Sequence, residues 1–185
     1  MKFVARVGIT LTLIAGIAAL SLALVNALTA PKIAEYEAMV IQQALAEVSG
    51  GYTLGESTTE NLGTGVSAQH QLLDSDGNLA GYILQLDGIG YGGEMTVMAS
   101  YHIDGEIVDA RLLANSETPG LGKKAEEPSY MNKFVGTGGD REVPVKINQL
   151  AKADADSISG STVTFNGIAK TLAFGSHYVT SLGGK

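Results

Sequence analysis

Residues 68–114, AQHQLLDSDGNLAGYILQLDGIGYGGEMTVMASYHIDGEIVDARLLA, consist of short apolar runs separated by turn residues. Runs of this kind, bounded by glycine, asparagine and aspartate, are typical of β-strands. We predict four strands, at 68–73, 79–86, 94–103 and 106–114. The connections between them are short, so consecutive strands can pair as antiparallel hairpins. An antiparallel sheet is therefore expected at the centre of the fold.

Turn residues mark where the chain reverses direction between the predicted strands. The segment 74–78, DSDGN, separates the first two predicted strands, and a glycine cluster at 88–93 separates the next two. Asp104-Gly105 is a two-residue hairpin signal before the last strand. Residues 51–67 have weak periodicity, so short strands and loops are both possible there.

Helices are predicted before and after the sheet region in the sequence. Pro31 suits the first turn of a new helix, and apolar residues recur at helical spacing over 32–48 until Gly50-Gly51 ends the pattern. Downstream we expect a loop at 115–128, a short helix at 129–135, a short strand at 143–147, and a C-terminal helix to Phe174, ended by Gly175. This order predicts an α+β domain, an antiparallel sheet with helices packed on it.

An apolar run without a charged side chain occupies residues 7–28. As a helix rising about 1.5 Å per residue, it would span about 33 Å, enough for the hydrocarbon core of a membrane. Lys2 and Arg6 precede it, while Glu35 and Glu37 follow it. The positive-inside rule then predicts a cytoplasmic N-terminus.

This pattern predicts a single-pass protein of the cytoplasmic membrane. Residues 1–30 would be the N-terminus and the lipid-embedded anchor, and residues 31–185 a domain on the periplasmic or extracellular side. A cleaved signal peptide is the alternative, although its apolar region would normally have only about 7–15 residues.

The composition excludes several classes of function. The net charge is −7, and nucleic-acid binding requires a basic face. There are no cysteines, so disulfides and thiolate metal sites are excluded. The three histidines lack metal-ligand spacing, and we expect no protein-bound metal. No pattern of a Ser/His/Asp nucleophile or of a paired-carboxylate hydrolase is present, so we predict no catalytic residues.

The stretch 156–164, DSISGSTVT, is a polar, glycine-containing turn before a predicted helix. Backbone N–H groups at a helix N-terminus attract anions, and Gly160 lacks a side chain where a phosphate would approach the backbone. A threonine hydroxyl here could carry a phosphoryl group. An ordinary N-cap is the alternative, in which Ser159, Ser161 or Thr162 bonds to the first turn of the helix.

The same stretch resembles the flavinylation motif Asp-x-x-Ser/Thr-Gly-Ala-Thr of the FMN-binding domain family. In this family a dedicated flavin transferase moves FMN from FAD onto the last threonine. The resemblance implies FMN bound covalently to Thr162 through a phosphoester, with Asp156, Ser159 and Gly160 completing the motif. Ser161 stands where alanine is usual and places a second hydroxyl beside the acceptor.

Two upstream segments strengthen the resemblance. Residues 117–122, ETPGLG, match a loop of the same family, in which Glu117 and Thr118 would bond to the flavin or its ribityl chain and Leu121 would pack on the ring. Residues 90–93, GYGG, resemble a further segment of the family, in which Tyr91 would stack on the flavin. A plain surface turn is the alternative for each segment.

The family includes the G subunit of the Rnf complex and the C subunit of the sodium-pumping NADH:quinone reductase. The shortness of this chain favours a function like that of the G subunit. The resemblance then implies an electron-transfer subunit in a membrane-bound, ion-translocating ferredoxin:NAD oxidoreductase, with other membrane subunits as partners. The function of the quinone-reductase C subunit and an unflavinylated, membrane-anchored assembly module are the alternatives.

Overall fold

The computed structural model of the chain describes residues 2–120, 122–158 and 160–183. It divides into two compact units, Met1–Ile41 and Gln42–Lys185. Helix α1, Lys2–Val48, makes up the first unit, and its last residues belong to the second. The helix is long and apolar enough to cross a membrane, and none of its most apolar window is buried. The predicted apolar helix is thereby confirmed.

The predicted helix start at Pro31 is wrong, because Pro31 lies inside α1. A proline within a helix removes one N–H donor, and its ring crowds the carbonyl four residues earlier, here that of Ala27. The helix continues on both sides of Pro31, and the alanine and lysine beside Pro31 are good helix formers. A single proline therefore does not divide this helix.

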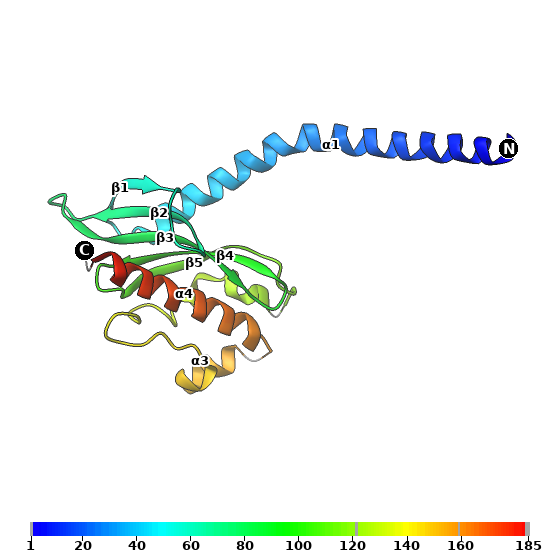
Figure 1. Cartoon of the computed structure of the whole chain (residues 1–185). Helices are drawn as coiled ribbons and strands as arrows, with labels where there is room; N and C mark the ends of the chain where they lie inside the picture. Colours follow the sequence, from blue (N-terminus) through cyan, green and yellow to red (C-terminus); the bar gives the residue numbers. More distant parts are fainter. Residues whose placement is uncertain (1, 121, 159, 184–185) are drawn as a thin grey trace. The chain divides into compact units, whose positions relative to one another are not determined.

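Five antiparallel strands form the sheet of the second unit in the simple order β1-β2-β3-β4-β5 (Figure 1). The strands are β1 Thr53–Thr58, β2 Val66–Leu73, β3 Leu79–Ile89, β4 Glu94–His102 and β5 Ile107–Asn115. The four predicted strands are confirmed. Strand β1 lies in the stretch without clear periodicity, because it is an edge strand with almost all of its residues exposed.

Local hydrogen bonds fix the first predicted hairpin. The Asp74 carboxylate accepts the N–H groups of Asn78 at 2.8 Å and Asp76 at 2.9 Å, and Gly77 has a φ of 82°. The hydrogen bonds from Asn78, together with those from Asp76 and Gly77, hold the pKa of Asp74 below its ordinary value. The turn chemistry recognised in the sequence therefore sets the register of β2 against β3.

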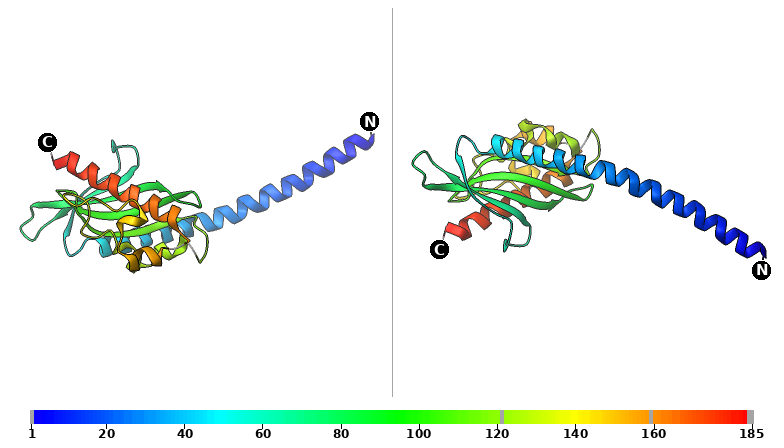
Figure 2. Two further views of the ribbon diagram at one scale, coloured as in Figure 1. Left: turned by 90° about the horizontal axis from the view of Figure 1, so that it is seen from below. Right: turned by 90° about the horizontal axis from the view of Figure 1, so that it is seen from above.

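Helix α4, Thr162–Gly183, crosses one face of the sheet (Figure 2). Its residues Phe165, Ile168 and Leu172 are fully buried. The predicted end of this helix at Gly175 is wrong, because α4 continues for two further turns. Gly175 is instead a packing glycine: a Cβ there would lie 2.2 Å from the hydroxyl oxygen of Tyr101.

Short elements connect β5 to α4. They are the 3-10 turns Gly122–Glu126 (η1) and Ile147–Gln149 (η2) and the helices α2 Pro128–Met131 and α3 Lys152–Ser157. The predicted short helix corresponds to α2, but the predicted strand at 143–147 is wrong. Val143 is buried and Val145 packs against the core. Their alternation reflects an extended segment that lies on the core without a strand partner. The predicted α+β architecture is confirmed.

Candidate functional site

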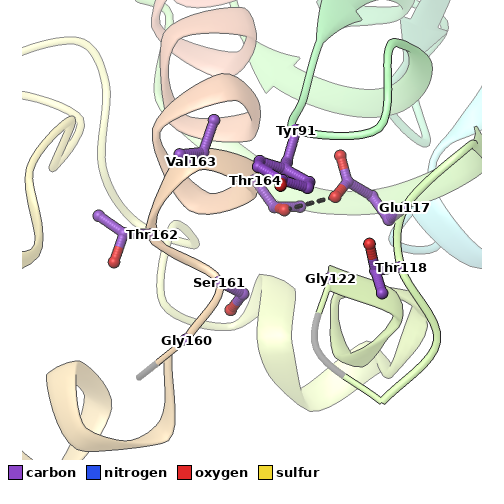
Figure 3. Close-up of a pocket in the computed structure, with 9 residues that line it drawn as sticks. All are labelled: Tyr91, Glu117, Thr118, Gly122, Gly160, Ser161, Thr162, Val163 and Thr164. Atoms are coloured by element: carbon purple, nitrogen blue, oxygen red, sulfur yellow. Dashed lines mark hydrogen bonds between the residues drawn. The ribbon is translucent and has the colours of Figure 1, made fainter.

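A cleft of about 460 Å³ opens at the N-terminal end of α4. Three segments far apart in sequence meet there: the β3–β4 turn, the loop after β5, and the start of α4 (Figure 3). The lining residues are Tyr91, Glu117, Thr118, Gly122, Gly160, Ser161, Thr162, Val163 and Thr164.

The start of α4 is fixed by backbone geometry. Gly160 has a φ of 89°, a conformation that residues with a Cβ rarely adopt. The Ser161 N–H donates to the Ile158 carbonyl at 2.9 Å, and the Ser161 carbonyl accepts the Phe165 N–H at 3.0 Å. Ser161 is therefore the N-cap position, and Thr162 is the first helical residue.

Three hydroxyl groups at this helix start have different environments. Ser161 is buried and donates to the Ile158 carbonyl at 2.9 Å, so the predicted alternative of a side-chain cap is not formed by Ser161. Thr164 is buried and donates to the Glu117 carboxylate at 2.6 Å. Thr162 is exposed, and its hydroxyl makes no hydrogen bond to another described residue. Figure 3 shows its side chain directed away from Glu117. Of these three hydroxyls, Thr162 is the accessible one.

Glu117 is the buried centre of the cleft wall, with 4% of its surface exposed. Besides the Thr164 hydroxyl, its carboxylate accepts the Gly92 N–H at 3.3 Å. A Cβ on Gly90 would lie 2.0 Å from one carboxylate oxygen, and a Cβ on Gly122 would lie 2.4 Å from the other. Glu117, Gly90, Gly92, Gly122 and Thr164, hereafter the Glu117 cluster, thus bind the three segments together.

The rim of the cleft is apolar. Tyr91 is 69% exposed and Val163 is 53% exposed, although both are large hydrophobic side chains. Figure 3 shows Tyr91 near Glu117 and Val163 on the first turn of α4, and both line the cleft. Thr118 lies across the cleft and is also exposed. The site therefore combines an apolar rim with a polar base, the usual composition of a small-molecule site.

The structure brings together most of the residues predicted from the sequence motifs. Tyr91, Glu117, Thr118, Gly160, Ser161 and Thr162 all line the cleft. Asp156 is exposed on α3 and is not among the lining residues. Leu121 and Ser159 lie outside the described residues, so their predicted roles stay predictions.

Thr164 was missed as a site residue. The signal was its spacing from Ser161, because residues three apart in a helix share one face. Its hydrogen-bond partner Glu117 is 47 residues away in the sequence, and no local sequence pattern predicts that contact.

Comparisons with known proteins show what the segment that forms the cleft is similar to. Residues 90–175 match the FMN-binding domain, a range that contains every residue lining the cleft, and residues 1–48 match the RnfG N-terminal region. The part of the chain that forms the cleft is therefore similar to the FMN-binding domain family. The chain's curated relatives include two that match over most of both chains, and both are G subunits.

The first of these is the G subunit of the ion-translocating oxidoreductase complex of Methanosarcina acetivorans, 26% identical over 97% of this chain and 96% of the relative. The second is the G subunit of the Na(+)-translocating ferredoxin:NAD(+) oxidoreductase complex of Acetobacterium woodii, 28% identical over 88% of this chain and 85% of the relative. The C subunit of the Na(+)-translocating NADH-quinone reductase of Vibrio alginolyticus is 32% identical, but over 50% of this chain and 40% of the relative. Among solved structures, Shewanella oneidensis NqrC matches with a TM-score of 0.49 and 18% identity, over 63% of this chain and 60% of that one.

The cleft fits the ligand of this family. Its volume of about 460 Å³ lies within the range of about 300–1,000 Å³ that is usual for small-molecule sites. An accessible hydroxyl stands beside a helix N-terminus, which favours a phosphate. The Tyr91 and Val163 side chains offer apolar surface to a ring system, and the buried Glu117 carboxylate offers an acceptor to hydroxyl groups.

Proposed function

We propose that this chain is the FMN-carrying electron-transfer component, the G subunit, of a membrane-bound, ion-translocating ferredoxin:NAD oxidoreductase complex. One observation carries the proposal: Tyr91 of the segment GYGG, Glu117 and Thr118 of the segment ETPGLG, and the accessible Thr162 of the flavinylation motif line one cleft. The whole-chain similarity to G subunits supports the same assignment. The other subunits of the complex would be its partners, and it would be a carrier rather than a complete enzyme.

We infer that FMN is attached covalently to Thr162. The Thr162 oxygen attacks the flavin-side phosphorus of FAD, the bond from that phosphorus to the adenylate half breaks, AMP leaves, and the threonine proton is released. A flavin transferase would supply FAD and catalyse this step. The exposure of Thr162 supports the assignment, since Ser161 and Thr164 are buried and already donate hydrogen bonds.

FMN supplies the redox chemistry, taking up and releasing electrons. The residues of this chain hold and orient it. The first turn of α4 stabilises the negative charge that remains on a phosphodiester. The Glu117 cluster holds the β3–β4 turn and the loop after β5 against the start of α4, while Tyr91 and Val163 offer an apolar wall to the ring.

We further propose that α1 spans the lipid bilayer, with residues 1–30 as N-terminus and anchor and residues 31–185 on the periplasmic or extracellular side. Lys2 and Arg6 before the apolar run support this orientation. Protease added to spheroplasts should digest the domain while α1 stays in the membrane. Digestion only after the membrane is ruptured would contradict this orientation.

The C subunit of a sodium-pumping NADH:quinone reductase is the second candidate. The match to such a protein covers 40% of the relative, whereas the match to the Methanosarcina G subunit covers 96%. The match of residues 1–48 to the RnfG N-terminal region also favours the G subunit. Membranes from a strain lacking this chain should lose ferredoxin-dependent NAD reduction. Loss of NADH-dependent quinone reduction instead would establish the second candidate.

Intact-mass measurement on protein from the native host tests the attachment. The parent chain should gain the mass of one FMN, and Thr162→Val should lose it. Thr180→Val is the matched control, because Thr180 is an exposed threonine on the same helix, and it should keep the flavin. Flavin mapped to Ser161 or Thr164 would contradict the assignment. A parent chain without any flavin would favour the unflavinylated assembly module.

A further inference from the structure

A buried hydroxyl without a partner lies behind the cleft. Tyr130, in α2, is 4% exposed, and its hydroxyl has no hydrogen-bond partner among the described residues. A buried, unsatisfied polar group is costly and rare in native proteins. The contrast with Tyr101 is direct, because the fully buried Tyr101 hydroxyl donates to the Leu172 carbonyl at 3.1 Å.

The neighbours of this hydroxyl belong to the cleft. Burial raises the pKa of Tyr130 to about 12, and the Glu117 charge adds to the rise. The phenol therefore keeps its proton at physiological pH and stays a donor. The Ser161 side chain is near enough to the phenol to lower its pKa, but the two hydroxyls do not meet the geometry of a hydrogen bond. Ser161 and Glu117 both line the cleft, and Figure 3 places Ser161 between Thr162 and Thr118.

Ser161 can change its hydrogen bonds at little cost. Its hydroxyl donates to the Ile158 carbonyl at 2.9 Å, and its own N–H donates to the same carbonyl at 2.9 Å. The carbonyl therefore stays satisfied if the hydroxyl rotates away. A serine hydroxyl donates one hydrogen bond and has two acceptor lone pairs. It can thus accept from Tyr130 while donating to a third group.

We propose that Tyr130 and Ser161 form a hydroxyl relay that supports the phosphate end of the FMN carried by Thr162. Tyr130 donates to Ser161, and Ser161 donates to a phosphate oxygen of the ligand. Ser161 is the binding residue, and Tyr130 is a positioning residue that acts through it. The inference rests on the proposed function. It gives a role to Ser161, which stands where the family motif has alanine.

The relay predicts that Tyr130→Phe has opposite effects on the two forms of the protein. Without flavin, the variant removes an unsatisfied hydroxyl, so the midpoint of thermal unfolding should stay the same or rise. With flavin, it breaks the relay, so the midpoint should fall by about 2–4 °C. Tyr101→Phe is the matched control, and it should lower both forms equally because its hydroxyl is satisfied in both.

The experiment uses the full-length chain in detergent, produced with and without the flavin transferase and checked by intact mass. Ser161→Ala should lower the midpoint of the flavinylated form, and Tyr130→Phe/Ser161→Ala should lower it no further than Ser161→Ala alone. The phosphorus NMR signal of the diester should shift in both single variants. Equal effects of Tyr130→Phe on both forms, with flavin present on Thr162, would overturn the relay alone. Absence of flavin on Thr162 in the parent would overturn the relay together with the attachment.

Discussion

Replacing Thr164 with valine removes the shortest side-chain hydrogen bond in the cleft. The Thr164 hydroxyl lies 2.6 Å from the Glu117 carboxylate, and both side chains are buried. Valine has nearly the same shape, so packing at the start of α4 should be preserved. The perturbation therefore isolates one hydrogen bond between the helix that carries Thr162 and the loop that follows β5.

The expected loss follows from the burial of the carboxylate. A hydrogen bond to a charged group contributes about 1.5–3 kcal/mol, and a buried acceptor left without a donor costs a similar amount. The remaining Gly92 N–H, at 3.3 Å, compensates little because it is long. We therefore expect Thr164→Val to lower the free energy of unfolding by about 2 kcal/mol. At about 2–4 °C per kcal/mol, the midpoint of thermal unfolding should fall by roughly 4–8 °C.

Calorimetry on the full-length, unflavinylated chain in detergent measures this loss. Thr180→Val is the control, because its exposed hydroxyl bonds only to its own helix, at the His177 carbonyl, and it should change stability by less than about 0.5 kcal/mol. Glu117→Gln keeps the shape of the side chain but removes its charge. In that background Thr164→Val should cost only about 1 kcal/mol, since a bond between neutral groups is weaker.

A loss below about 0.5 kcal/mol for Thr164→Val would refute this account of the cleft. Equal losses in the parent chain and in the Glu117→Gln variant would show that the two side chains are not energetically coupled. Flavin occupancy adds a second readout. Since Thr164→Val loosens the contact between the start of α4 and the loop after β5 but leaves the Thr162 hydroxyl intact, we expect covalent FMN to be retained and its potential or reduction rate to change.

Three further perturbations test the fold and the helix start. Gly175→Ala should lower the free energy of unfolding by about 1–3 kcal/mol, because the added Cβ would meet the Tyr101 hydroxyl. Combining it with Tyr101→Phe should recover part of the loss. Unchanged stability of Gly175→Ala in denaturant unfolding would contradict this packing. Gly160→Ala forces a φ of 89° on a residue with a Cβ, at a cost of about 1–3 kcal/mol. The variant should incorporate flavin more slowly, as measured by in-gel fluorescence. An unchanged rate would show that this backbone conformation is not needed. Stability should fall as pH rises from about 10 to about 12, because the unfolded Tyr130 ionises while the folded one keeps its proton; Tyr130→Phe should reduce this fall, and identical pH profiles would refute the burial of the phenol.

The sequence predicted those elements whose signals are local. The hairpin turns carry their own hydrogen bonds, as at Asp74, and the apolar run of α1 needs no partner to be recognised. The sequence left one element open and misplaced the end of another where tertiary contacts decide the structure. Strand β1 is held by its pairing with β2, and α4 continues through Gly175 because that glycine allows close packing on Tyr101.

For the candidate site, the sequence predicted which residues take part but not how they contact one another. Resemblance supplied the motif residues, including Thr162 and Glu117, but not the contacts among them. The Glu117–Thr164 bond joins residues 47 positions apart, and the Tyr130 hydroxyl became notable only through burial. Neither fact has a local signal in the sequence. The structure therefore added the environment of each hydroxyl, which is what distinguishes Thr162 from its neighbours.

The chain contains 24 glycines, above average usage, and three of them have a structural role at Glu117. A Cβ on Gly90 or Gly122 would come within 2.4 Å of the carboxylate, and a Cβ on Gly92 would lie 2.0 Å from the Ser116 carbonyl. These glycines let the protein backbone close around its own buried carboxylate, so they serve the cleft before any ligand enters it. The Glu117 carboxylate fills the space beside Gly90 and Gly122, and the Gly92 N–H donates a hydrogen bond to it. The effects of substitutions at Glu117 and at these glycines on stability should therefore depend on one another. Non-additive losses are then expected among them, as for any set of residues that shares one contact.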